Sequence, residues 1–99
     1  MLTITETARD GTVVLALAGE LDMSTRSDLL AAVDKLRDVT AVALDCADLR
    51  FCDATGVAAL LEARAAARSA GIDLTVVDVR GLPRKVLSIC AVLPLLTGE

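Results

Sequence analysis

The residues best suited to do chemistry lie between Leu44 and Gly56, where an apolar segment runs into Asp53-Ala54-Thr55-Gly56. This pattern puts a hydroxyl group where a strand ends and a helix begins. Free N–H groups and the positive end of the helix dipole favour an anion at such a position, so a phosphate on Thr55 would be well held there. The alternative interpretation is that Asp53 caps the helix and Thr55 is an ordinary first-turn residue.

Other reactive groups are scarce. The chain has no histidine, the commonest general base and metal ligand. It has no glycine-rich phosphate loop and no nucleophile paired with a base, and Asp45 and Asp48 are more simply polar residues at a strand end. Cys46, Cys52 and Cys90 lack the CxxC spacing of a zinc site and are odd in number, so we expect buried reduced thiols. We expect no enzyme activity, no cofactor and no metal.

Length and charge narrow the function further. The chain has 99 residues, which predicts one domain spanning residues 1–99. Its 14 acidic and 10 basic residues give a net charge of −4, and Phe51 is the one aromatic residue, which argues against nucleic acid. The longest uncharged stretch, Val86 to Gly98, is shorter than the roughly 20 residues that span a membrane. With no signal-peptide pattern at the N-terminus, we expect a cytoplasmic protein without membrane insertion.

Hydrophobic patterning predicts the elements that hold the Asp53–Gly56 segment. Residues Leu2–Ala8 alternate between apolar and polar, as in a half-buried strand, and Arg9-Asp10-Gly11 predicts a turn. The next segment, Thr12–Ala18, is almost wholly apolar and predicts a strand covered on both faces. These two strands should form an antiparallel hairpin.

The rest of the chain alternates between helix and strand. Thr25 followed by Asp28 resembles a capping box at the start of the first helix, although Ser24 is an alternative cap. A link through Ala47 and Asp48 is expected to follow the third strand, Gly71 to cap the second helix, and Pro94 to limit the third. The predicted helices are Ser24–Asp38, Gly56–Ala70 and a segment opening at Gly81, and the predicted strands are Ala41–Asp45 and Ile72–Val79.

This order predicts an α/β fold with a mixed, mostly parallel four-stranded sheet, an N-terminal antiparallel hairpin and three or more helices. In the helix after Thr55, small residues that would let the helix lie close to the sheet share one side. A separate arc mixes apolar and basic groups and is a candidate interface. The small residues are Ala59, Ala63, Ala66, Ala67 and Ala70, and the separate arc holds Val57, Leu61, Arg64 and Arg68.

Two segments carry a family resemblance: Gly19-Glu20-Leu21-Asp22 before a helix, and Asp53-Ala54-Thr55-Gly56 after a strand. Together they resemble the STAS domain of bacterial anti-sigma factor antagonists, and the likeness covers nearly the whole chain. It implies the STAS fold, and it implies that the hydroxyl residue before the glycine, here Thr55, accepts phosphate. Ala54 stands where many relatives have a second hydroxyl, which leaves Thr55 as the single acceptor.

The resemblance also implies a partner-switching cycle. The unphosphorylated domain would bind an anti-sigma factor that is a serine/threonine kinase of the histidine-kinase-like ATPase fold, and would thereby free a sigma factor. Phosphorylation of Thr55 would release the domain, and a PP2C-type phosphatase would reset it. The alternative function is that of a STAS accessory subunit of an ABC-type lipid transporter ATPase.

The expected contacts with the partner lie around Thr55. Asp22 is assigned to the interface, with a simple loop or capping role as the alternative. Thr25 borders the site or caps its helix, and Leu61 is either an interface or a core residue. The full expected set is Asp22, Thr25, Asp53, Thr55, Gly56, Val57, Leu61 and Arg64.

Overall fold

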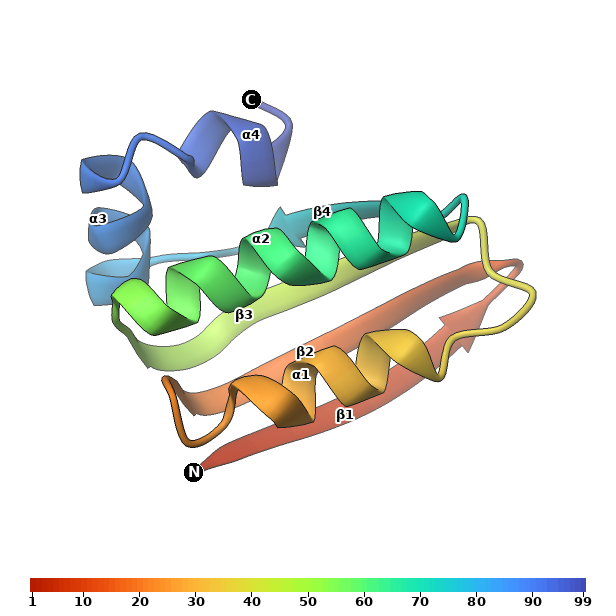
Figure 1. Cartoon of the computed structure of the whole chain (residues 1–99), viewed down its shortest axis with the longest axis horizontal. Coiled ribbons are helices and arrows are strands. Elements are labelled where there is room, and N and C mark those ends of the chain that lie inside the picture. Colours follow the sequence, from red (N-terminus) through yellow and green to blue (C-terminus); the bar gives the residue numbers. More distant parts are fainter.

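The computed structural model describes all residues from 1 to 99 as a four-stranded sheet with helices packed against it (Figure 1). The strands lie in the order β1-β2-β3-β4, with β1 and β2 antiparallel and the other neighbours parallel. The elements are β1 (Leu2–Arg9), β2 (Thr12–Leu21), α1 (Arg26–Asp34), β3 (Ala41–Cys52), α2 (Ala54–Ser69), β4 (Asp73–Val77), α3 (Gly81–Ile89) and α4 (Leu93–Thr97). The predicted fold class is confirmed, as is the predicted alternation of strands and helices along the chain.

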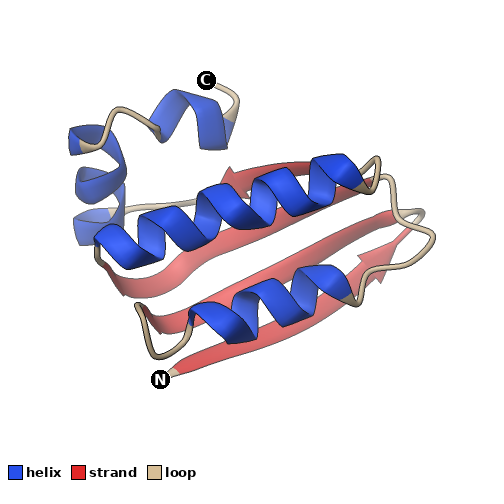
Figure 2. Ribbon diagram, in the orientation of Figure 1, coloured by secondary structure: helices blue, strands red, loops and turns tan.

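Helices α1 and α2 lie side by side across the same face of the sheet (Figure 2). The side chains of this face form the core with the inner sides of both helices. In β2 the buried residues Val13, Leu15 and Leu17 alternate with the half-buried Val14 and Ala16. The prediction that this strand is covered on both faces is therefore wrong: the small and β-branched residues on its other face stay partly accessible.

The hairpin between β1 and β2 closes through Asp10 and Gly11, which have φ angles of 50° and 80°. Positive φ at both central residues is typical of a type I′ turn, whose twist matches that of the two strands. The pairing runs from Leu2 opposite Gly19 to Arg9 opposite Thr12 without a register shift. The predicted antiparallel hairpin is confirmed.

Helix α1 is shorter than the predicted Ser24–Asp38, because it begins at Arg26 and ends at Asp34. The predicted capping box is wrong: Thr25 occupies the N-cap position, but its side chain makes no capping bond to the helix. Its hydroxyl instead bonds to the end of β2, and that bonding holds the preceding residues in a turn.

Strand β3 is longer than predicted, because it continues through Ala47 and Asp48 to Cys52. Its register with β2 shifts after Asp45, as in a β-bulge. Asp45 Oδ1 accepts the N–H of Ala47 at 3.0 Å, so a side chain replaces a missing ladder bond at the irregularity. With this hydrogen bond in place, β3 continues through polar residues at the point where the sequence pattern predicts its end.

Helix α2 buries Ala59, Ala63 and Ala67 against the sheet, whereas Ala66 and Ala70 are exposed. The alanine face is therefore confirmed for Ala59, Ala63 and Ala67 only. Gly71 ends the helix with φ of 76°, and its N–H donates to the carbonyl of Arg68, as expected for a glycine C-cap.

Candidate functional site

The N-terminus of α2 lies at the edge of the sheet where the parallel strands β2 and β3 end. Asp53 is the N-cap residue: its Oδ1 accepts the N–H of Gly56 at 2.9 Å. Thr55 is the second residue of the helix and is half-buried. The N–H groups of Ala54 and Thr55 have no intrahelical acceptor, as in the first turn of any helix. Thr55 thus sits at the positive end of a 16-residue helix.

Gly56 fixes how closely this helix approaches the sheet. A Cβ atom at Gly56 would overlap the carbonyl oxygen of Leu21 and would lie 2.7 Å from Cys52 Sγ. The first turn of α2 therefore rests on the ends of both β2 and β3. Because Thr55 and Asp22 are the sequence neighbours of Gly56 and Leu21, this contact brings the two segments together.

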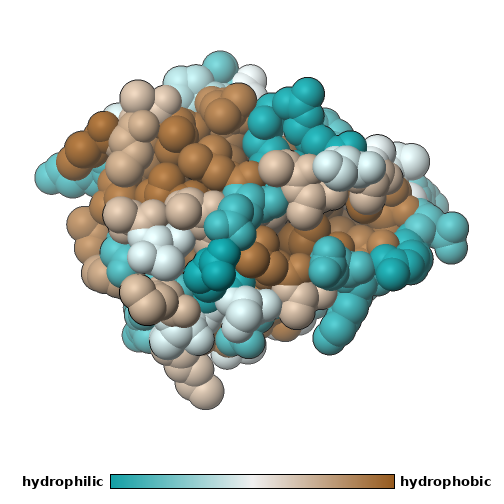
Figure 3. Space-filling view, viewed as in Figure 1, coloured by the Kyte–Doolittle hydropathy of each residue, from teal (hydrophilic) through white to brown (hydrophobic).

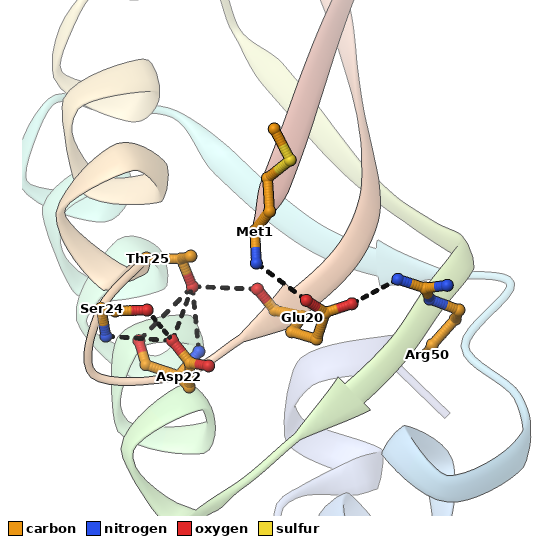
Figure 4. A network of polar contacts seen from close by, with 6 residues as sticks. All are labelled: Met1, Glu20, Asp22, Ser24, Thr25 and Arg50. Carbon is orange, nitrogen blue, oxygen red and sulfur yellow. Dashed lines mark hydrogen bonds and ion pairs between the residues drawn. The ribbon is translucent and has the colours of Figure 1, made fainter.

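The turn after β2 is held by side-chain hydrogen bonds around Asp22 (Figure 4). The Ser24 hydroxyl donates to Asp22 Oδ1 at 2.7 Å, and the Ser24 N–H donates to the same oxygen at 3.0 Å. The hydroxyl of Thr25 accepts the Asp22 N–H at 3.0 Å and donates to the Glu20 carbonyl at 2.9 Å. The hydrogen bond from the Ser24 side chain lowers the pKa of Asp22, so this carboxylate stays charged at neutral pH.

Glu20 forms a second polar cluster beside this turn (Figure 4). One of its oxygens accepts from the amino group of Met1 at 2.8 Å, and the other pairs with Arg50 of β3. These hydrogen bonds, led by the one from the amino group, lower the pKa of Glu20. The charge of Glu20 is therefore already matched, whereas Asp22 and Asp53 have no basic partner.

Sequence comparison identifies the fold family. The family described as "Mlab, STAS domain" matches residues 4–96. The chain belongs to this STAS family. No curated protein sequence matches the chain significantly. No group of three His, Cys, Asp or Glu side chains is arranged to hold a metal ion, and no helix of this STAS domain is long and apolar enough to cross a membrane.

Several solved structures resemble this STAS domain. The anti-sigma factor antagonist SpoIIAA in its unphosphorylated form has a TM-score of 0.71 and 23% identity, covering 93% of this chain and 84% of that chain. The Bacillus cell fate determinant SpoIIAA in the phosphorylated form has a TM-score of 0.65 and 22% identity, and the match covers 98% of this chain and 88% of that chain. A sulfate transporter family protein from Wolinella succinogenes has a TM-score of 0.79 and 19% identity, and the match covers 94% of this chain and 77% of that chain.

The residues expected at the interface divide into two groups in the STAS domain. Asp22, Asp53 and Thr55 are half-buried at the rim, and Leu61 and Arg64 are half-buried along α2. The other three lie inside the domain: Val57 is 5% exposed and Thr25 is 4% exposed, while Gly56 is packed against β2.

Val57 is thus a core residue, which corrects its assignment to an accessible arc. On a helical wheel, Val57 lies apart from the alanine side of α2. Core residues nevertheless surround the first turn of the helix, so both Val57 and the sheet-facing alanines are buried. Leu61 is half-buried and packs partly against the core, so part of its side chain stays accessible along α2.

Exposed apolar side chains at the same edge of the sheet were missed by sequence reasoning. Met23 is 75% exposed in the turn after β2, Phe51 is 38% exposed near the end of β3, and Leu82 is 50% exposed at the start of α3. Apolar surface is visible over the α3 and α4 region in the space-filling view (Figure 3). The available signal was the presence of large apolar residues in segments expected to be turns or helix starts.

Proposed function

We propose that this STAS domain is an anti-sigma factor antagonist regulated by phosphorylation of Thr55. In its unmodified form it binds a kinase-type anti-sigma factor of the histidine-kinase-like ATPase fold, which frees a sigma factor. The kinase transfers phosphate from ATP to Thr55, and the modified domain is released. A PP2C-type phosphatase returns it to the binding form.

The observation that carries this proposal is the environment of the Thr55 hydroxyl. Three hydroxyl groups belong to the two segments at this edge. Those of Ser24 and Thr25 are engaged in hydrogen bonds that hold the Asp22 turn. The Thr55 hydroxyl makes no such structural hydrogen bond, and Thr55 is partly accessible at the N-terminus of α2. A kinase can therefore modify Thr55 without breaking a structural contact, and the existence of SpoIIAA in a phosphorylated form supports this use of the fold.

Release follows from charge. A phosphate adds about −1.5 to −2 charge, and the helix N-terminus tolerates it within the folded domain. At the rim it joins the carboxylates of Asp22 and Asp53, neither of which has a basic partner. A partner surface that fits the unmodified rim then faces a strong new negative field. A loss of about 1.4 kcal/mol weakens binding tenfold, and repulsion at a partly desolvated contact readily exceeds that.

The proposed interface consists of this rim and its surroundings. Asp22, Asp53 and Thr55 provide the polar centre, and Leu61 and Arg64 extend it along α2. Thr25 and Gly56 act indirectly, because they position the turn and the helix. The exposed side chains of Met23 and Leu82 at the same edge provide apolar contact area.

The test is phosphate transfer between purified proteins. The domain is incubated with purified kinase-type anti-sigma factors and ATP, and the modified residue is located by mass spectrometry. Wild type and Ser24→Ala should gain one phosphate on Thr55, and Thr55→Ala should gain none. Ser24→Ala is the matched control, because it removes another hydroxyl from the same edge. Phosphate on Ser24 in the wild type, or binding that phosphorylation leaves unchanged, would contradict the proposal.

A second candidate function is that of an accessory subunit of an ABC-type lipid transporter ATPase. It is favoured by the match to the family described as "Mlab, STAS domain". A stable complex with a purified transporter ATPase, formed without phosphate transfer, would support this function instead.

A further inference from the structure

The outer edge of β1 is open. This strand is the first in the sheet, so only β2 pairs with it, and no helix runs along its other side (Figure 1). It is eight residues long. An edge strand presents unpaired N–H and C=O groups that can bind a further strand.

The hairpin determines which backbone groups point outward. In a two-residue hairpin the residues flanking the turn, here Arg9 and Thr12, exchange both backbone hydrogen bonds, and every second residue of β1 then does the same. The N–H of Glu20 donates to the Met1 carbonyl at 2.9 Å, which agrees with this alternation. Odd-numbered residues therefore bond to β2. The outward N–H and C=O groups are those of Leu2, Ile4, Glu6 and Ala8.

Most of the features that usually protect an edge are missing from β1. The strand contains no proline and no lysine, and its pairing with β2 has no bulge over its full length. Proteins normally use such features to prevent pairing between edges. The charged residues are Glu6 and Arg9, so a partner strand has to avoid setting like charges opposite each other.

We propose that two copies of the chain pair antiparallel through β1, with Thr5 facing Thr5 of the second copy on the two-fold axis. In this register, the outward-pointing N–H and C=O groups of β1 face the outward-pointing groups of the second copy along the whole segment from Leu2 to Ala8. A register centred on Glu6 sets two carboxylates opposite each other. A register centred on Ile4 leaves Ala8 unpaired. Of these three registers, the one centred on Thr5 pairs every outward-pointing residue from Leu2 to Ala8 and also keeps the two Glu6 carboxylates from facing each other.

The side chains in this register are also compatible. Thr3 faces Thr7 of the second copy, and Thr5 faces its own symmetry mate, all on the sheet face that α1 and α2 leave uncovered. Cross-strand threonine pairs are favourable neighbours in antiparallel sheets. On the other face Ile4 lies beside Glu6 of the second copy. Four hydrogen-bonded residue pairs supply about eight backbone hydrogen bonds.

The paired sheet has eight strands and leaves both Thr55 sites free. The N-terminal end of β1 lies near the Thr55 edge, because β1 runs antiparallel to β2. Antiparallel pairing of the two β1 strands therefore puts the Thr55 sites at opposite ends of the dimer. The proposed dimer and the proposed phosphorylation use different parts of the domain, so an experiment can contradict one proposal without contradicting the other.

The first measurement is the mass of the purified chain by sedimentation equilibrium up to millimolar concentration. A rise towards twice the 10.3 kDa of one chain is expected. Thr5→Glu should weaken the dimer at least tenfold, since it puts two carboxylates opposite each other on the axis. Thr7→Glu is the matched control: it changes an exposed threonine on the same face, but its new carboxylate faces Thr3 and should have a smaller effect. A wild-type mass of one chain at every concentration would overturn the proposal.

Disulfide formation tests the register. In a chain carrying Cys90→Ser, Thr5→Cys should form a cross-linked dimer under mild oxidation, because facing residues of a non-hydrogen-bonded pair have Cα atoms about 4.5 Å apart. Thr7→Cys should not, because its symmetry mate lies about 13 Å away along the strand. Equal cross-linking of both variants, or cross-linking of Thr7→Cys alone, would overturn the proposed pairing.

Discussion

Gly56 in the first turn of α2 lies directly against the carbonyl oxygen of Leu21, the last residue of β2. This approach leaves no room for a side chain, and it joins the segment that carries Thr55 to the turn that carries Asp22. The glycine of the Asp-Ala-Thr-Gly segment is therefore a packing requirement. Its φ angle lies outside the left-handed region, so the constraint is space rather than backbone conformation.

Gly56→Ala should destabilise the domain by about 1–3 kcal/mol, because the added methyl group forces α2 away from the ends of β2 and β3. Urea denaturation measures this loss. Thr55→Ala, in the same turn, should change the free energy of unfolding by less than about 0.5 kcal/mol. Equal stability of Gly56→Ala and wild type would show that the helix is not held at this distance.

Asp53→Ala should cost about 1 kcal/mol of stability, since the Gly56 N–H loses its capping acceptor. Asp53→Asn separates the cap from the charge, because asparagine caps helices about as well as aspartate. This variant should keep nearly wild-type stability while it removes one carboxylate from the rim. Thermal unfolding of the two variants compares them. Similar losses in both would mean that the charge, and not the cap, stabilises this end of α2.

Thr25→Val should cost about 1–3 kcal/mol, because it leaves the partly buried Asp22 N–H and Glu20 carbonyl without the Thr25 hydroxyl as their hydrogen-bond partner. Valine preserves the shape of the side chain, so the loss reports the hydroxyl. Thr25→Ser keeps the hydroxyl and should retain more stability than Thr25→Val. Chemical denaturation of the three proteins tests the order, and a valine variant as stable as the serine variant would contradict it.

Sequence patterning predicted the hairpin, the order of strands and helices along the chain, and most of α2, because each depends on local signals. Asp10-Gly11 specifies a tight turn, and Gly71 ends a helix by adopting positive φ. The predicted start of this helix at Gly56 is too late, because α2 begins at Ala54; the alternative interpretation, with Asp53 as the cap and Thr55 in the first turn, is the one that holds.

Other features depend on contacts between distant segments, which no local pattern encodes. Thr25 has the sequence context of a helix cap, yet its hydroxyl bonds to Glu20 in the preceding strand. Val57 lies on the wheel away from the alanines, yet the core reaches it. The continuation of β3 through Asp48 required the bulge that Asp45 stabilises. Tertiary packing decided each of these cases.

The three cysteines should differ sharply in reactivity. Burial raises the pKa of both Cys46 and Cys52 to about 12, whereas Cys90 is exposed, so the expectation of a buried thiol is wrong for Cys90. Because the thiolate is the reactive form, a thiol reagent at neutral pH should modify Cys90 quickly in the folded domain and reach the other two only after unfolding. Counting modified thiols by mass spectrometry before and after adding urea tests this. Fast modification of Cys46 in the folded domain would contradict it.

The same raised pKa values make stability depend on alkaline pH. In the unfolded chain these thiols have their ordinary pKa of about 9.0, whereas in the folded domain the pKa of both is about 12. Between these values the folded state binds more protons, so the free energy of unfolding should fall as pH rises, and below pH 9 this contribution is fully present. Urea denaturation at pH 7 and pH 10.5 measures the change. Cys46→Ala should show a smaller fall, since one of the two titrating groups is gone; an equal fall would assign the effect to other groups.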